Sequence, residues 1–255
     1  NNMSAKLQVV PTTNQSYTVE EIAERAGRVI RSALANGVTR IRSHVDVDNI
    51  GGLRPLEGVA EARRRHQDVM DIQIVAFPQE GILKNKGTEE LIWQAMEAGA
   101  DVVGGIPHFE RTMEEGAESV RQLCAVAAER GLRIDMHCDE TDDPMSRHIE
   151  TLCRETLRLG LQGRVAASHL TSMHVMDNYY ASKLIPLIAE SEITVIPSPL
   201  TNIAAWGKNN GSYPKWRGIT RVPELLEADG TVAFGQDCVM DPWYSLGSAD
   251  MLEVA

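Results

Sequence analysis

The sequence predicts an α/β fold, specifically a (β/α)8 barrel of the TIM type, from three observations. Helical patterns alternate with short apolar strands along the chain, and this alternation is typical of a parallel sheet. The chain has 255 residues, which is the size of one such barrel. Several strands end on a residue that can bind a metal or transfer a proton, and a barrel collects such residues at its mouth.

The predicted elements follow one another as helix–strand units. The first helix is expected to begin at Thr18, because Glu21 completes a capping box there. It ends near Gly37, and its strand lies at 39–45. Six more units follow, namely helix 53–67 with strand 72–77, helix 89–98 with strand 102–106, helix 118–129 with strand 133–137, helix 146–159 with strand 164–168, helix 180–190 with strand 193–196, and helix 222–228 with strand 231–235.

These patterns give seven strands, whereas a closed barrel needs eight. We expect the missing first strand to precede residue 1, because the chain opens with a loop and a helix, and 251–255 ends within a helical pattern. Residues 1–255 are therefore predicted to be a single barrel domain truncated at both ends. An open doubly wound sheet is the alternative, but functional residues at so many strand ends fit a barrel mouth better.

Composition excludes several classes of partner. Lys and Arg total 25 and Asp and Glu total 36, a net charge of −11, which argues against nucleic acid or an anionic membrane. No run of about 18 apolar residues that could span a membrane occurs. The four cysteines form no CxxC motif, which indicates reduced thiols and a cytoplasmic location.

Two histidines and two carboxylates stand out at the strand ends. His137 and His169 end successive strands, Glu140 lies three residues after His137, and Asp237 follows an apolar strand. A single buried histidine is more often satisfied by a backbone carbonyl, but this combination favours a converging metal site. A carboxylate in the place of Asp237 is costly unless it binds something or caps a helix, and Pro242 argues against that helix. Glu140 is suited to proton transfer, although a solvated loop carboxylate fits equally.

Three further side chains follow strand ends. Gln79 offers a carboxamide that suits the amide edge of a heterocycle, and a loop hydrogen bond is the alternative for it. His44 and His108 are expected to support the site or to serve a structural role.

Several longer stretches strengthen this interpretation together. They are 42–47 (RSHVDV), 74–82 (IVAFPQEGI), 106–110 (IPHFE), 137–140 (HCDE), 168–169 with 173–174, 213–214 with 217–222, and 241–244 (DPWY). Over nearly everything after about residue 20, the chain resembles bacterial cytosine deaminases of the amidohydrolase superfamily.

The resemblance implies a role for each site residue. His137 is expected to bind the metal from the fifth barrel strand, and Asp237 from the eighth, where it also takes a proton from the water on the metal. Glu140 would carry a proton to the ring nitrogen. His169 would orient the water without needing to bind the metal, and Gln79 would hold the amide edge of a pyrimidine.

The resemblance also implies the chemistry and the partners. One divalent metal ion, Fe²⁺ or Zn²⁺, would activate a water that displaces ammonia from cytosine or a 5-substituted cytosine such as 5-methylcytosine. The partner is then a small nucleobase in a homo-oligomeric enzyme, with Trp243 and Cys238 at the substrate. The alternatives are an amidohydrolase acting on a triazine or isoguanine, and a metal-free barrel that binds a small molecule.

The chain departs from the family pattern at two points. The His-x-His pair of the first strand and the flanking β-sandwich segments are absent from the sequence, and two ligands are too few for a catalytic metal. We therefore expect that pair on a strand before Asn1. The family's second Asp is Cys238 here, a smaller and less polar side chain, which leaves room for a methyl group on the ring. The alternative is that Cys238 only packs against the barrel wall.

Overall fold

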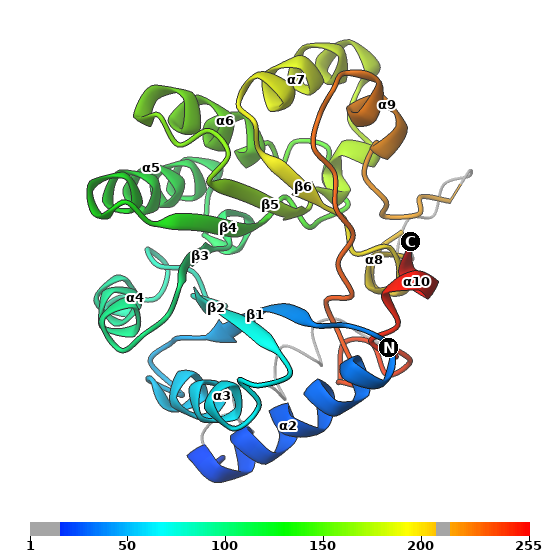
Figure 1. Cartoon of the computed structure of the whole chain (residues 1–255). Helices are drawn as coiled ribbons and strands as arrows, with labels where there is room; N and C mark the ends of the chain where they lie inside the picture. Colours follow the sequence, from blue (N-terminus) through cyan, green and yellow to red (C-terminus); the bar gives the residue numbers. More distant parts are fainter. Residues whose placement is uncertain (1–15, 208–214) are drawn as a thin grey trace.

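The protein is described by a computed structural model over residues 16–207 and 215–255. Its centre is a curled parallel sheet with helices on the outer face (Figure 1). The strands are β1 (Arg40–Asp46), β2 (Asp71–Phe77), β3 (Val102–Gly105), β4 (Arg133–Cys138), β5 (Val165–His169) and β6 (Thr194–Ile196). They are paired in sequence order without a reversal, whereas a doubly wound sheet reverses its strand order, so the barrel type of connectivity is confirmed.

The helices alternate with the strands as the sequence predicts. They are α2 (Val19–Ala35), α3 (Arg54–Arg65), α4 (Thr88–Glu97), α5 (Met113–Arg130), α6 (His148–Leu159), α7 (Asn178–Glu190), α8 (Pro199–Ala205), α9 (Val222–Glu227) and α10 (Met251–Val254), with 3-10 turns η1 (Pro107–Phe109) and η2 (Thr171–His174). The capping box of α2 is confirmed, since the side chains of Thr18 and Glu21 each accept from the other's backbone N–H. Helix α5 begins before the predicted 118 because Thr112 accepts from Glu115 N and caps it there.

The predicted strand at 231–235 is wrong as a full strand. Val232 makes a single parallel bridge to Val195, and Ala233 N and Gly235 N donate to Val195 O and Pro197 O at 3.0 and 2.9 Å. The segment thus runs beside β6, but no described residue pairs with its other edge, and Phe234 is 38% exposed. The described residues form a curled six-stranded sheet that is not a closed eight-stranded barrel, and the strand expected before residue 1 stays a prediction.

Side-chain alternation along β4 separates the core from the concave face. Ile134, Met136 and Cys138 belong to the buried core between the sheet and the helices. Because successive strand residues point to opposite faces, Asp135 and His137 lie on the concave side. The alternation therefore places the polar side chains of β4 on the concave face of the sheet.

Two observations concern the redox state of the cysteines and the possibility of a membrane-spanning helix. All four cysteines are free and buried, as expected for reduced thiols. Among the described residues, no helix has the length and apolar character needed to cross a membrane.

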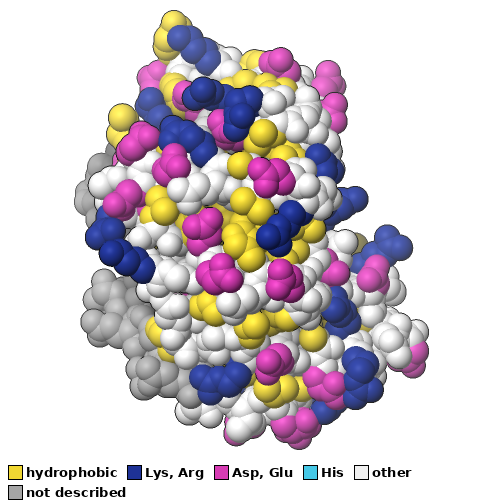
Figure 2. Space-filling model, turned by 90° about the vertical axis from the view of Figure 1, so that its left-hand side faces the viewer, with side chains coloured by type: hydrophobic (Ala, Val, Ile, Leu, Met, Phe, Trp, Pro, Cys, Tyr) yellow, Lys and Arg dark blue, Asp and Glu magenta, His cyan; other side chains and the backbone are white. Residues whose placement is uncertain are grey.

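The outer face on the left of Figure 1, where α4 and α5 lie, carries interspersed acidic and basic side chains (Figure 2). On α5, for example, Arg121 Nη1 lies 3.0 and 3.1 Å from carboxylate oxygens of Glu114 and Glu118. Among the described residues of this face the two charges are mixed, unlike the extended basic surface that binds a phosphate backbone.

Candidate active site

A cavity of about 1020 Å³ lies on the concave side of the sheet. Its lining comes from α2, from strands β1, β2, β4, β5 and β6, from the turn after β3, and from the segments after β6. All seven residues that the sequence singles out for catalysis, metal or substrate line it: Gln79, His137, Glu140, His169, Asp237, Cys238 and Trp243. The structure thus gathers residues that lie up to about 160 positions apart in the chain.

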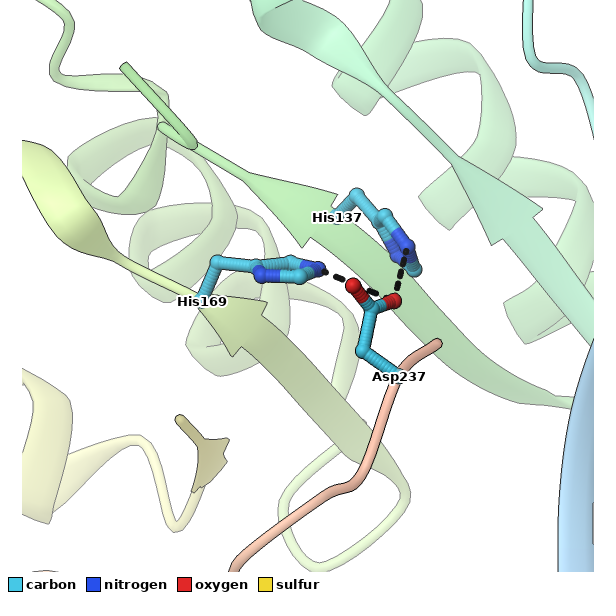
Figure 3. Close-up of side chains that lie close together, drawn as sticks. All are labelled: His137, His169 and Asp237. Atoms are coloured by element: carbon cyan, nitrogen blue, oxygen red, sulfur yellow. Dashed lines mark ion pairs between the residues drawn. The ribbon is translucent and has the colours of Figure 1, made fainter. Parts of the chain in front are cut away.

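The centre of the cavity is a cluster of two histidines and one carboxylate. His137 is the last residue but one of β4, His169 ends β5, and both rings point toward the Asp237 carboxylate (Figure 3). Asp237 Oδ1 lies 3.7 Å from His137 Nε2 and 3.9 Å from His169 Nε2. One potential ligand atom from each residue falls within 4.8 Å of the others, so the three side chains surround a point where an ion could be held.

The chemistry of these groups fits a divalent metal. Two imidazole nitrogens and a carboxylate oxygen are donors for Zn²⁺ and for Fe²⁺. His137 Nδ1 and His169 Nε2 are buried without a hydrogen-bond partner among the described residues, which is costly unless something else contacts them.

The protonation states of the cluster suit metal binding. Burial, together with the neighbouring His169 and His44, lowers the pKa of His137 to about 3, so the ring is in the neutral form that binds metals. Burial alone would raise the pKa of Asp237, but His169 and the hydrogen bond with His137 outweigh it and hold that pKa well below its usual range. Asp237 is therefore an anion near neutral pH.

Glu140 lies beside the cluster on the loop that leaves β4. Its side chain is 16% exposed, and Oε1 accepts a hydrogen bond from Trp206 Nε1 at 3.0 Å. Burial raises the pKa of Glu140, and the Asp237 charge raises it further against the opposing effects of His169 and Trp206. A carboxyl group with a raised pKa in a cavity is suited to general acid–base catalysis.

Asp139 fixes the loop that carries Glu140. The Asp139 side chain is fully buried, and its backbone has φ at 52°. Its carboxylate accepts from Ser146 Oγ at 2.7 Å and from His148 Nδ1 and Ile149 N at 2.8 Å. Asp139 therefore joins the loop to the first turn of α6, and no sequence spacing indicated this bond.

His44 supports the cluster from β1, as expected. Its ring centroid lies 4.5 Å from that of His137, and its Nε2 lies 3.4 Å from Asp135 Oδ1. Asp135 is itself buried and accepts from Arg42 and Ser168 at 2.9 and 3.1 Å. The ring of His137 thus contacts His44, and His44 is in turn paired with the buried carboxylate of Asp135.

His108 does not line the cavity. Both of its ring nitrogens are buried without a hydrogen-bond partner among the described residues, and burial lowers its pKa to about 3. Its expected structural role stays a prediction.

The loop of Gln79 is held by a buried carboxylate from the next unit. Glu110 accepts from the backbone N–H groups of Ile82, Leu83 and Lys84 at 2.7, 3.1 and 2.7 Å. Gly81 has φ at 81°, and a Cβ there would lie 2.9 Å from the Glu110 carboxylate. The turn therefore needs glycine, and Glu110 anchors the backbone that follows Gln79.

Cys238 and Trp243 line the cavity from the segment that begins at Asp237. Cys238 is 5% exposed, and its Sγ lies 3.4 Å from Asp237 Oδ2, so the thiol is next to the candidate ligand. Burial raises the pKa of the Cys238 thiol, and Asp237 adds to the effect. Trp243 lies in a turn that begins at Asp241. The Oδ1 atom of Asp241 accepts a hydrogen bond from Trp243 N at 2.8 Å.

A curled parallel sheet with histidines and carboxylates at its strand ends is typical of barrel hydrolases that hold a metal at the mouth. The chain belongs to the Amidohydrolase family, whose model matches residues 3–255. The family predicted from the sequence is thereby confirmed.

Three relatives illustrate the range of activities among similar proteins. The 5-methylcytosine deaminase from Klebsiella pneumoniae liganded with phosphonocytosine is 41% identical with a TM-score of 0.95, covering 99% of this chain and 61% of that one. N-isopropylammelide isopropylaminohydrolase from Burkholderia multivorans ATCC 17616 is 34% identical with a TM-score of 0.76, covering 88% of this chain and 54% of that one. Pterin deaminase from Rhizobium rhizogenes is 29% identical over 240 residues, 94% of this chain and 54% of the relative. The chain thus spans little more than half the length of these relatives.

Proposed function

We propose that this chain is the major part of the catalytic barrel of a metal-dependent deaminase. Its substrate is cytosine or a 5-substituted cytosine such as 5-methylcytosine, and ammonia is released. The observation that carries the proposal is the convergence of His137, His169, Asp237 and Glu140 in one cavity. The similarity to a 5-methylcytosine deaminase over 99% of the chain supports the choice of substrate.

Each side chain has a role in this proposal. His137 and Asp237 hold the ion, and the rest of the ligand set is the His-x-His pair expected before Asn1. When bound, Fe²⁺ or Zn²⁺ supplies a water that is nucleophilic at neutral pH. Asp237, an anion, accepts a proton from the attacking water, and Glu140 transfers a proton to the ring nitrogen. Gln79 holds the amide edge of the ring while ammonia leaves from the attacked carbon.

A second enzymatic function is favoured by the N-isopropylammelide relatives, of which one is a solved structure and another is a Pseudomonas enzyme 28% identical to this chain. In that case the same residues remove an amine from a triazine or a related ring such as isoguanine. A metal-free binding barrel is the alternative from a different class. The homo-oligomeric state and the cytoplasmic location also stay predictions.

The proposal is tested on the full-length protein by metal analysis and by ammonia release from cytosine, 5-methylcytosine, isoguanine and an ammelide. We expect about one metal ion per chain and the fastest release from one of the two cytosines. Faster release from the ammelide or isoguanine would support the second enzymatic function. A protein without metal and without ammonia release would support the binding barrel.

Cys238→Asp is expected to reduce the preference for 5-methylcytosine over cytosine. The buried thiol is less polar than a carboxylate, and one methyl group in an apolar pocket is worth roughly 10–200-fold in specificity. The measurement is the ratio of kcat/KM for the two substrates, with Cys238→Ala as the control that keeps the space and the low polarity. An unchanged ratio in Cys238→Asp would mean that Cys238 does not determine specificity.

Glu110→Ala is expected to raise KM with a smaller effect on kcat, because it releases the backbone that positions Gln79. The loss of one hydrogen bond to the substrate, about 1.5 kcal/mol, corresponds to about tenfold in KM. Steady-state kinetics checks this, with Glu114→Ala, an 82% exposed carboxylate of α5, as the control. A lower melting temperature with an unchanged KM would assign Glu110 to stability alone.

A further inference from the structure

Asn202 is a fully buried amide on α8 that contacts the candidate metal cluster through His169. It is 0% exposed, and its side chain makes two contacts. The Oδ1 atom lies 3.2 Å from Ser198 N, and the Nδ2 atom lies 2.9 Å from His169 Nδ1. Asn202 thus connects the start of α8 to the histidine that ends β5.

The first contact determines the orientation of the amide. A backbone N–H can only donate, so the atom facing Ser198 N must be the carbonyl oxygen of Asn202. This argument does not depend on how the side-chain oxygen and nitrogen were assigned. The NH2 group of Asn202 therefore faces His169.

The second contact then determines the tautomer of His169. An NH2 group can only donate, so His169 Nδ1 must accept and carries no proton. A neutral imidazole with a bare Nδ1 has its proton on Nε2. That Nε2 is buried, has no hydrogen-bond partner among the described residues, and points toward Asp237 (Figure 3).

The other groups facing His169 do not favour the opposite tautomer. Glu140 Oε1 lies 3.5 Å from His169 Nδ1, which is long for a hydrogen bond, and it already accepts from Trp206 Nε1 at 3.0 Å. The ring of His137, 4.4 Å away between centroids, is neutral. A proton on Nδ1 would face the NH2 group of Asn202 at 2.9 Å.

We infer that Asn202 is a positioning residue that sets the Nε2–H tautomer of His169, so that His169 presents a hydrogen-bond donor to the reacting groups and no lone pair to the metal. The tautomer follows from the hydrogen bonds alone, whereas its role in catalysis rests on the proposed function. The same segment also places Glu140, since Trp206 follows α8 and Gly207 N donates to Asp142 Oδ2 at 2.9 Å. One short helix after β6 therefore orients both proton-handling side chains.

The direct test is the tautomer itself, read from ¹H–¹⁵N correlations of the full-length, metal-free protein labelled at histidine nitrogen. The chain has seven histidines, and the signals of His169 are assigned by their loss in His169→Gln. We expect a proton on Nε2 and none on Nδ1. A proton on Nδ1 would overturn the inference, and this reading is made on the native protein, with His169→Gln serving only to assign the signals.

Asn202→Asp supplies the second measurement. A carboxylate accepts from Nδ1–H, so we expect the proton to move to Nδ1 and Nε2 to become available as a ligand. Zn²⁺ affinity, measured by competition with a chelator, should rise, while kcat falls by about 10–100-fold, the usual effect of a residue that orients a metal-site side chain. Unchanged tautomer and Zn²⁺ affinity in a folded variant would overturn the inference.

The matched control is Asn178→Asp, because Asn178 Oδ1 accepts from Arg221 Nη2 at 2.9 Å on the surface of α7 and an aspartate keeps that bond. It should change neither the His169 signals nor the affinity for Zn²⁺. Failure of the proposed function is distinguishable, because the tautomer is read without metal or substrate. An Nε2–H His169 in a protein without deaminase activity would reject the function and leave the role of Asn202 intact.

Discussion

Glu140→Gln is expected to lower kcat by about 10²–10⁴-fold, the usual contribution of general acid–base catalysis, while the metal content stays unchanged. Glutamine keeps the size of the side chain and can still accept from Trp206 Nε1, which lies 3.0 Å from Oε1 in the native protein. It cannot transfer a proton to the ring. The measurement is kcat for ammonia release together with elemental analysis of the same preparation.

The control for this variant is Glu224→Gln on α9, whose carboxylate is 46% exposed, and it should leave kcat unchanged. Activity of Glu140→Gln within a few fold of the native protein would remove Glu140 from the mechanism. A simultaneous loss of metal would mean that Glu140 supports the ion and would argue against a purely proton-transferring role.

The variant His137→Ala is expected to lose the bound metal ion, which is the second large effect. Removing residues that merely orient a ligand costs about 10–100-fold in metal affinity, so removal of a ligand itself should cost more. Elemental analysis after dialysis and chelator competition measure this effect. The loss should also abolish turnover, because the nucleophilic water depends on the ion.

His174→Ala is the matched control for the loss of an imidazole, because His174 lies exposed in η2. It should retain the metal and the activity. Full metal content in His137→Ala would exclude His137 from the ligand set and leave the ion to other side chains of the cavity.

The repeating part of the fold could be predicted from the sequence because local signals agree with the global arrangement. The capping box at Thr18 and the apolar strands that become β1 to β6 are such signals. The segment at 231–235 has the same apolar composition, yet a strand also needs partners. Among the described residues this segment has a partner only on the side of β6. Its composition alone therefore predicts a full strand where the structure has a single bridge.

The candidate site was predictable to the same extent and for the same reason. His137 and His169 lie at the carboxyl ends of two paired parallel strands, so their side chains are expected to be close together. Asn202, Trp206 and Asp139 were missed because their partners come from other units of the chain. Such contacts depend on how α6 and α8 pack, and no spacing within the sequence encodes that packing.

The buried carboxylate of Asp139 has a consequence for local stability. It ties α6 to the loop of Glu140, and its backbone oxygen accepts from Ser172 N at 3.1 Å in η2. Segments joined by buried hydrogen bonds open together as cooperative units. Fraying of α6 at its first turn would therefore disorder the Glu140 loop at the same time, so the thermal resistance of the proposed activity depends on a helix that contributes no residue to the cavity.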